Sequence, residues 1–149
     1  LPAKVDLVTC FHDGLNYLLD INDIRQTFAR VHDNLRRGGA FIFDLNTVKW
    51  LAAMENGANF VDEDDMTLLW QTSYDHAQNI WQITITGFVR ENGFYRKFSE
   101  THREKGYTPE EITRCLQETG LIPLGSFDAF TFNPIRDNGI RHFFVAYKE

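Results

Sequence analysis

The sequence predicts an α/β fold in which a small parallel sheet is interrupted by an inserted antiparallel β meander. Two apolar runs, 5–10 and 40–46, flank a helical pattern, and strand, helix and strand in this order form one βαβ unit. Residues 67–104 instead hold three stretches of β-type residues separated by turns. Of the 149 residues, 43% are hydrophobic and 14% aromatic, which is enough for one domain with its own core.

The βαβ unit begins with Val5–Cys10, whose apolar and β-branched residues predict a buried strand. A polar loop follows, and Asp20 or Asn22 can cap the next helix. Apolar residues recur along this helix at the spacing that buries one face. Two arginines and Gly38-Gly39 are expected at its end, because cations suit a helix C-terminus and glycine stops a helix. Ala40–Asn46 is the second buried strand.

The middle of the chain changes character. Residues 48–54 predict a short helix, and the acidic residues 55–65 predict a connector. Alternating apolar and polar residues, with turn residues between them, predict an antiparallel meander of three strands, at 67–74, 80–90 and 94–104.

Local signals also define the last part of the chain. Thr108-Pro109-Glu110-Glu111 is a capping box with proline at the first helical position, so a helix begins there. Residues 123–132 and 140–147 predict two closing strands, joined by a turn-rich segment.

Charge and hydropathy narrow the possible functions. The formal net charge is −6 without a basic run, so nucleic acid is an unexpected partner, because its binding depends on phosphate contacts. No apolar run approaches the roughly 20 residues of a membrane span, and no signal pattern opens the chain. We therefore expect a cytoplasmic protein without a membrane partner, with Cys10 and Cys115 as reduced thiols. The five histidines are too scattered for a metal-ligand spacing, so no metal is expected.

Three segments carry a resemblance to a known family. Leu35-Arg36-Arg37-Gly38-Gly39 resembles a Leu-x-Pro-Gly-Gly turn, with Arg37 in the place of proline. Asp13 with Leu15-Asn16-Tyr17-Leu18 is similar to an Asp-Ser-Leu-Asn-Tyr stretch, and residues 88–104 resemble an inserted antiparallel β element. In this order, the motifs resemble those of class I S-adenosylmethionine-dependent methyltransferases, in a bacterial subgroup of the small-molecule type.

The resemblance covers nearly the whole chain and implies a partial Rossmann-like methyltransferase sheet. Val5–Cys10 matches the fourth strand of the family and Ala40–Asn46 the fifth. The two closing strands match the sixth and seventh, of which the last runs antiparallel between the fifth and the sixth. Residues 1–149 are then one incomplete methyltransferase domain, and residues 48–106 form an inserted lid subdomain over the substrate.

Two cofactor motifs of the family do not occur in the sequence, the Gly-rich turn after its first strand and the acidic residue that ends its second. Gly38-Gly39 leaves a helix instead of opening one, so it offers no helix N-terminus to a ligand. We therefore expect the chain to be the second half of a methyltransferase and inactive alone. The free edge of Val5–Cys10 is expected to pair with the missing N-terminal half or with a second copy, as a homodimer.

The resemblance also implies a site beyond the carboxyl ends of the strands, where open α/β sheets bind ligands. The residues expected at S-adenosylmethionine are Cys10, Phe11, His12 and Asp13. The residues expected at a small-molecule substrate are Asn16, Tyr17, Asp44, Asn46 and, from the lid, Arg103. Methyl transfer is an in-line displacement that depends on positioning more than on a strong acid or base, so no catalytic residue is assigned.

Simpler explanations stay open for several of these residues. Asp13 can serve only to turn the chain, Asn16 can cap it, and Asp44 can satisfy the strand end. Two other functions also stay open. One is a non-catalytic partner-binding or dimerisation module built on half of a methyltransferase fold, with the meander as interface. The other is a methyltransferase relative that modifies RNA or protein, which the net charge disfavours.

Overall fold

Two four-stranded sheets organise the chain in the computed structural model, which describes residues 3–149. The first sheet has the strand order β1-β2-β8-β7 and the second has the order β3-β4-β5-β6. In the first sheet, β1 (Val5–Cys10) runs parallel to β2 (Leu35–Asn46). Between β2 and β7 (Leu121–Asp128) lies β8 (Arg141–Lys148), antiparallel to both. This order confirms the predicted partial α/β sheet.

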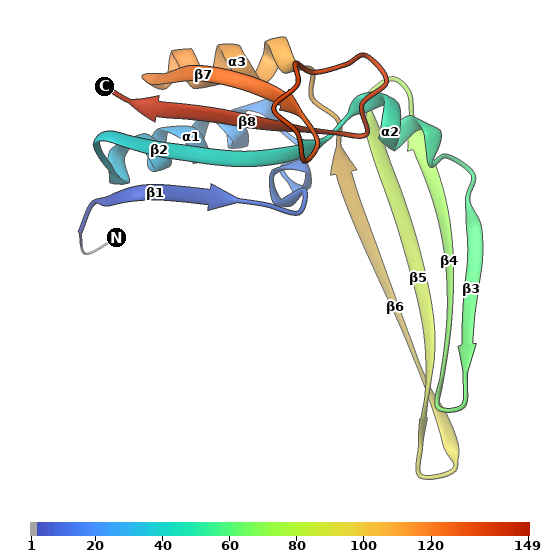
Figure 1. Cartoon of the computed structure of the whole chain (residues 1–149). Helices are drawn as coiled ribbons and strands as arrows, with labels where there is room; N and C mark the ends of the chain where they lie inside the picture. The colour runs from blue at the N-terminus through green and yellow to red at the C-terminus, as the bar shows by residue number, and fades with distance from the viewer. Residues whose placement is uncertain (1–2) are drawn as a thin grey trace.

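Two helices, α1 (Ile21–Asn34) and α3 (Pro109–Glu118), cover one face of the first sheet (Figure 1). The ring of Phe28 in α1 lies 5.3 Å from that of Phe43 in β2, which stacks on Phe144 in β8 at 5.1 Å. Aromatic rings at such separations attract each other beyond the area that they bury. This face therefore holds the main core of the protein.

The opposite face of the first sheet is more open. Ile42, Phe143 and Val145 alternate with the core residues along their strands and are only partly buried. The loop after β7 lies over part of this face, where Phe130 and Phe132 help to line a hollow of about 270 Å³. These two phenylalanines are 88% and 94% exposed. The sheet thus has one packed face and one partly open, apolar face.

The end of α1 differs from the prediction. The helix ends at Asn34, and the segment Arg36-Arg37-Gly38-Gly39 belongs to β2 instead of ending the helix. Leu35 is fully buried and pairs with Val5, so the chain enters the sheet before it reaches the glycines. Gly38 has a φ of 76°, which favours glycine, and the register of β1 and β2 shifts here. The glycine pair therefore forms an irregularity within a strand.

The second sheet has four strands, where the sequence predicted three. It follows the short helix α2 (Val48–Ala53), and all its neighbouring strands are antiparallel. Its strands are β3 (Ala58–Glu63), β4 (Met66–Asp75), β5 (Ile80–Glu91) and β6 (Phe94–Lys105). The predicted connector at 55–65 was therefore wrong, because it contains β3. Every residue of β3 is exposed, so this strand has no buried face that would reveal it in the sequence.

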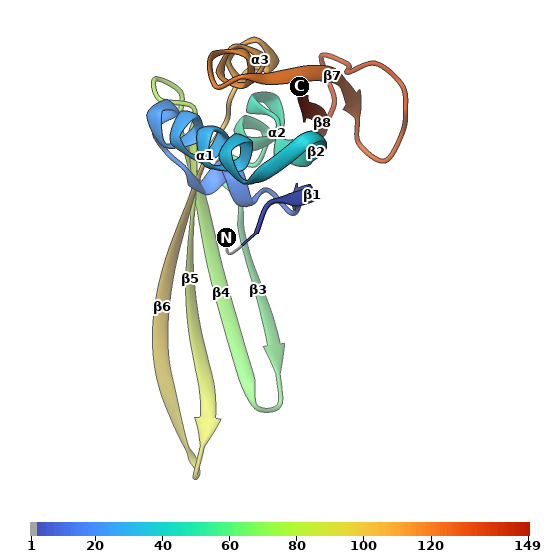
Figure 2. The ribbon, with the colours of Figure 1, turned by 90° about the vertical axis from the view of Figure 1, so that its left-hand side faces the viewer.

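The second sheet projects away from the first (Figures 1 and 2). The chain enters and leaves this sheet near the carboxyl end of β2, because α2 follows β2 directly and Lys105, at the end of β6, is bonded to Asn16 in the segment after β1. Leu51, Tyr74 and Trp81 form its small buried cluster near this junction. The outer part of the sheet is held mainly by its backbone ladders.

The C-terminal elements match the prediction apart from shifted strand ends. Thr108 and Glu111 form the predicted capping box, and α3 begins at Pro109. The strand β7 ends at Asp128, before the predicted residue 132. There the chain turns, and the carbonyl oxygen of Asp128 accepts hydrogen bonds from the backbone N–H and the hydroxyl of Thr131.

Candidate functional site

A strained loop folds back onto a buried carboxylate at the carboxyl ends of β1 and β2. The backbone N–H groups of His12 and Asp13 donate to the carboxylate of Asp44 at 3.2 and 2.8 Å. His12 and Asp13 have φ values of 60° and 54°, a left-handed conformation that costs energy in residues other than glycine. Charge-assisted hydrogen bonds to Asp44, which is 3% exposed, offset that cost. Strain of this kind concentrates at functional sites, which makes this loop a candidate.

Arg141, at the start of β8, joins the two aspartates. Its Nη1 lies 3.0 Å from Oδ1 of Asp44, and its Nη2 lies 2.7 Å from Oδ1 of Asp13. The side chain of Arg141 is 20% exposed and that of Asp44 is 4% exposed, so these ion pairs are shielded from water. Burial opposes the charge of Arg141, but the hydrogen bonds with Asp13 and Asp44 raise its pKa. The guanidinium thus fixes both carboxylates side by side.

Asn16 is fully buried in the short 3-10 helix η1 (Gly14–Tyr17) and ties three segments together. Its Oδ1 accepts from the backbone N–H of Asn46 at 2.9 Å. Its Nδ2 donates to the carbonyl oxygens of Asn46 at 3.2 Å and of Lys105 at 2.8 Å. A carboxamide has two hydrogens, so Asn16 has none left for a ligand. These bonds give Asn16 a positioning role and lend no support to the predicted substrate contact.

A buried glutamate from β6 joins these side chains. Together they form a polar cluster, whose inner members are Asp13, Asn16, Asp44, Asn46, Glu104 and Arg141. The Nδ2 of Asn46 donates to Oε2 of Glu104 at 2.8 Å, and Glu104 is 5% exposed. Burial raises the pKa of Glu104, and the carboxylate of Asp13 adds to the rise while the bond from Asn46 opposes it. The predicted site residue Asn46 therefore connects β2 to a carboxyl group of the second sheet.

Tyr17 and His102 form the accessible side of the cluster. The Oη of Tyr17 lies 3.3 Å from Nδ1 of His102, and the two rings meet edge to face at 6.1 Å. Tyr17 is 48% exposed, so a ligand can reach its hydroxyl. Partial burial raises the pKa of Tyr17, and the carboxylates of Glu104 and Asp13 raise it further. The phenol therefore keeps its proton at neutral pH.

The four residues predicted at the cofactor lie together at the end of β1. Phe11 is 45% exposed, and its ring lies 5.9 Å from that of Phe143. Cys10 is partly buried, and burial together with the Asp44 carboxylate raises the pKa of its thiol, which stays protonated. His12 is exposed, and Asp13 is bonded to Arg141 as described above. Their contact with a cofactor stays a prediction.

Arg103 lies apart from the cluster. It is exposed and pairs with Gln82 across β5 and β6. Its neighbours His102 and Glu104 point to the other face of β6, because successive side chains of a strand alternate. The geometry therefore does not bring Arg103 to the site, and its substrate contact stays a prediction.

Three residues of the cluster were not predicted from the sequence: Arg141, His102 and Glu104. The alternation that places Glu104 and His102 on one face of a strand is a signal that could have found them. No comparable signal exists for Arg141, because its partners Asp44 and Asp13 are 97 and 128 positions away.

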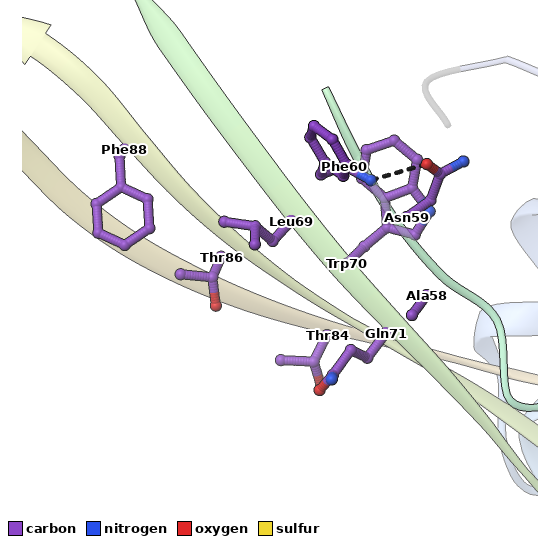
Figure 3. Close-up of a pocket in the computed structure, with 9 residues that line it drawn as sticks. All are labelled: Ala58, Asn59, Phe60, Leu69, Trp70, Gln71, Thr84, Thr86 and Phe88. Carbon is purple, nitrogen blue, oxygen red and sulfur yellow. Dashed lines mark hydrogen bonds between the residues drawn. The ribbon is translucent and has the colours of Figure 1, made fainter. Parts of the chain in front are cut away.

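A separate hollow of about 520 Å³ lies on the second sheet (Figure 3). Its lining is mostly apolar and includes Phe60, Leu69, Trp70, Thr84, Thr86 and Phe88. Thr84 points to the face of β5 opposite Trp81, and Trp81 pairs with Glu104. The hollow and the polar cluster therefore lie on opposite faces of this sheet.

Among residues 3–149, no group of three or more His, Cys, Asp or Glu side chains could hold a metal ion. None of the helices in the described part of the chain has the length and apolar character needed to cross a membrane.

Comparison with known proteins finds similar methyltransferases. No family model matches the chain. A protein of Geobacillus sp. (strain WCH70), provisionally named a methyltransferase, is 31% identical over 148 residues, which are 98% of this chain and 60% of that protein. The crystal structure of an S-adenosylmethionine-dependent methyltransferase from Clostridium acetobutylicum ATCC 824 matches with a TM-score of 0.87 and 29% identity, over 99% of this chain and 60% of that one. Over nearly its whole length, the chain is therefore similar to S-adenosylmethionine-dependent methyltransferases.

The chain spans about 60% of the length of both relatives. The S-adenosylmethionine-bound amino pentose methyltransferase CalS10 of Micromonospora echinaspora shares the fold, with a TM-score of 0.70 and 19% identity over all of this chain and 60% of that one. The strand order β1-β2-β8-β7 agrees with the fourth, fifth, seventh and sixth strands of the methyltransferase sheet, as the sequence predicted.

Proposed function

We propose that the intact protein transfers a methyl group from S-adenosylmethionine to a small molecule. One observation carries this proposal. A chain that matches an S-adenosylmethionine-dependent methyltransferase over 99% of its residues has a strained loop and a buried polar cluster at the carboxyl ends of β1 and β2. In open α/β sheets, ligands bind at this position.

The residues present suit one side of such a cofactor. Phe11 offers an exposed aromatic ring beside Phe143, on which an adenine can stack. The carboxyl groups of Asp13, Asp44 and Glu104 surround a single guanidinium, that of Arg141. This excess of negative charge suits a sulfonium cation. S-adenosylmethionine, when bound, supplies an electrophilic methyl group. We assign to its side of the site the loop residues Cys10, Phe11, His12 and Asp13.

The contribution of this chain to methyl transfer is alignment. Arg141 fixes the loop through Asp13 and the strand end through Asp44, while Asn16 fixes the strand end to β6. A misplacement of about 1 Å in such a site can slow a reaction about 100-fold, because the reacting atoms must lie in line. The interlocked bonds therefore support a site built for positioning.

We propose that residues 48–106 act as a lid on the substrate side. The lid strand β6 delivers His102 and Glu104 to the cluster, so a movement of the second sheet opens or closes the site. Tyr17 is accessible at this junction, whereas Asp44 and Asn46 are buried behind it. We therefore propose Tyr17 as the direct contact with the methyl acceptor, and the two buried residues as its support.

We further propose that the open face and the free edge of the first sheet are covered in the working protein. Within residues 3–149, β1 pairs with β2 alone, and its Leu7 is 52% exposed. An N-terminal half of the same fold would cover this edge and add the glycine-rich turn and the ribose-binding carboxylate. Residues 1–149 alone are then inactive. We expect this protein in the cytoplasm, with both cysteines as thiols.

The free edge also favours a second candidate, a non-catalytic module that binds a partner or a second copy. Exposed Phe130 and Phe132 beside the open face support this alternative, since large apolar patches mark interaction surfaces. The two candidates differ in their ligand. The enzyme binds S-adenosylmethionine, and the module does not.

Thermal unfolding of the intact protein separates these candidates. The enzyme is expected to unfold at a higher temperature with S-adenosylhomocysteine, because a ligand at 100 times its dissociation constant stabilises a protein by about 2.7 kcal/mol. Adenosine triphosphate serves as the control nucleotide. An unchanged unfolding temperature with S-adenosylhomocysteine would favour the binding module.

A further inference from the structure

Tyr17, His102 and Glu100 form a hydrogen-bonded chain that methyl transfer by alignment does not use. Oη of Tyr17 lies 3.3 Å from Nδ1 of His102, and Nε2 of the same ring lies 3.4 Å from Oε2 of Glu100. His102 and Glu100 are two residues apart in β6, so they share one face of the strand. This face meets η1, which carries Tyr17.

The positions of the protons along this chain follow from its chemistry. The carboxylate of Glu100 can only accept, so Nε2 of His102 carries a hydrogen and donates to it. In the neutral imidazole, Nδ1 is then an acceptor, and the hydroxyl of Tyr17 donates to it. Both ring nitrogens are occupied, so a methyl acceptor cannot bond to His102 directly. It can bond to Tyr17, whose oxygen has free lone pairs and whose side chain is half exposed.

We propose that Tyr17 takes the proton of the methyl acceptor while it passes its own proton to His102. This inference rests on the proposed methyltransferase function and adds the chemistry of the acceptor, which is a basic amine. Tyr17 is a catalytic residue in this scheme. His102 is a positioning residue that acts through Tyr17, and Glu100 holds the imidazole in the required tautomer.

The atoms and electrons balance as follows. An N–H bond of the ammonium breaks, and its proton moves to Oη of Tyr17, while the hydroxyl proton of Tyr17 moves to Nδ1 of His102. The freed nitrogen lone pair forms a bond to the methyl carbon. The electron pair of the carbon–sulfur bond stays on sulfur, which becomes a neutral thioether. The imidazolium, stabilised by Glu100, later returns its proton to water.

The charges around Tyr17 favour an amine over a neutral acceptor. The carboxyl groups of Glu100, Glu104 and Asp13 surround the Tyr17–His102 pair, and β5 contributes the uncharged Ile83 opposite His102. The cation of the cluster, Arg141, is already bonded to two aspartates. An ammonium ion is therefore attracted to this position. It must lose a proton before its nitrogen can attack, which is the task that Tyr17 and His102 perform.

Nitrogen NMR of the intact protein, labelled with ¹⁵N at histidine, tests the proton chain without any cofactor. We expect a hydrogen of His102 on Nε2, and a shifted Nδ1 signal in Tyr17→Phe, which removes only the hydroxyl. His76, which follows β4 and whose Nε2 is bonded to Glu55 in the turn after α2, is the matched control and keeps its signals. A hydrogen on Nδ1 of His102 in the wild type, or unchanged His102 signals in Tyr17→Phe, would overturn the proposal.

Butylammonium and butanol, as probes of equal size, test the acceptor class in the same samples. Butylammonium is expected to shift the His102 signals, with affinity about tenfold lower in Tyr17→Phe because a bond to a charged group is lost. Butanol is expected to cause no shift. Equal binding of both probes would overturn the amine assignment. These readings need no S-adenosylmethionine, so they can fail while the protein still binds its cofactor. If they succeed and the cofactor does not bind, only the proposed function is rejected.

Discussion

The side-chain amide of Asn16 donates a hydrogen bond to the backbone carbonyl of Lys105 at 2.8 Å, although the two residues are 89 positions apart. Through the same side chain, Asn16 also holds both backbone groups of Asn46. One buried amide therefore connects the loop after β1, the end of β2 and the last residue of β6 in the proposed lid. The geometry of the site depends on this connection.

Replacement of Asn16 by alanine is expected to destabilise the protein by about 3 kcal/mol, because it leaves buried backbone groups of Asn46 and Lys105 without partners. Urea denaturation measures this loss. Asn59→Ala is the matched control, since Asn59 is exposed in β3, and its effect is expected within about 0.5 kcal/mol. A loss in Asn16→Ala as small as in the control would contradict the connecting role.

Arg141→Met is expected to cost about 3–5 kcal/mol, because it leaves the buried carboxylate of Asp44 without its cation. The double variant with Asp44→Asn should lose less than the sum of the two single changes, since the unpaired charge is gone. Arg96→Met tests the exposed pair with Glu91, which is worth about 1 kcal/mol or less. Strict additivity of the two changes at Arg141 and Asp44 would show that the pair is not coupled.

Glu104 gives the protein a pH dependence of defined sign. Its pKa is higher in the folded chain than in the unfolded chain, so the folded state binds the proton more tightly. The contribution of Glu104 to stability is therefore full at low pH and is lost as the pH rises through its folded pKa. Glu104→Gln keeps the acceptor for Asn46 and removes the charge.

Urea denaturation from pH 4 to pH 8 checks this expectation. The variant Glu104→Gln should lose less stability than the wild type as the pH rises, and it should be the more stable protein at neutral pH. Glu110→Gln, at an exposed position in α3, is the control and should follow the wild type. The opposite sign in Glu104→Gln would mean that Glu104 is stabilised as a carboxylate.

The elements that the sequence predicted well are those defined by neighbouring residues. The capping box of Thr108 and Glu111 fixes the start of α3 with residues three positions apart. The buried strands β1 and β2 also carry their own apolar signal. The strand β3 does not, since it is held by backbone pairing with β4 while all its side chains are exposed.

The site was predictable only in part for the same reason. The loop residues Cys10–Asp13 lie at the end of the apolar strand β1, and Asp44 lies near the end of the apolar strand β2, so the neighbours of each reveal it. Arg141 becomes their partner only because β8 inserts beside β2 and starts opposite Asn46. Such long-range placement is a property of the sheet order, and no local signal at Arg141 reports it.

The free edge of β1 leads to a prediction about assembly. Residues 1–149 alone are expected to self-associate at protein concentrations on the order of tens of micromolar, because an uncapped edge strand offers unpaired backbone groups. Light scattering measures this association. Leu7→Lys should weaken this association, since lysine on an edge strand opposes pairing. Leu124→Lys, on the opposite edge strand β7, should not. A stable monomer whose Val5–Cys10 amides exchange rapidly would refute pairing through this edge.

Calorimetric titration of the intact protein with S-adenosylmethionine tests the central proposal most directly. One binding event is expected, weakened in Phe11→Ala by about 1–3 kcal/mol, the usual contribution of an aromatic ring that stacks on a base. Phe94→Ala, which removes a 79% exposed ring at the far end of β6, should bind like the wild type. Residues 1–149 alone should bind weakly or not at all. No detectable heat with the folded intact protein would contradict the proposed methyltransferase activity.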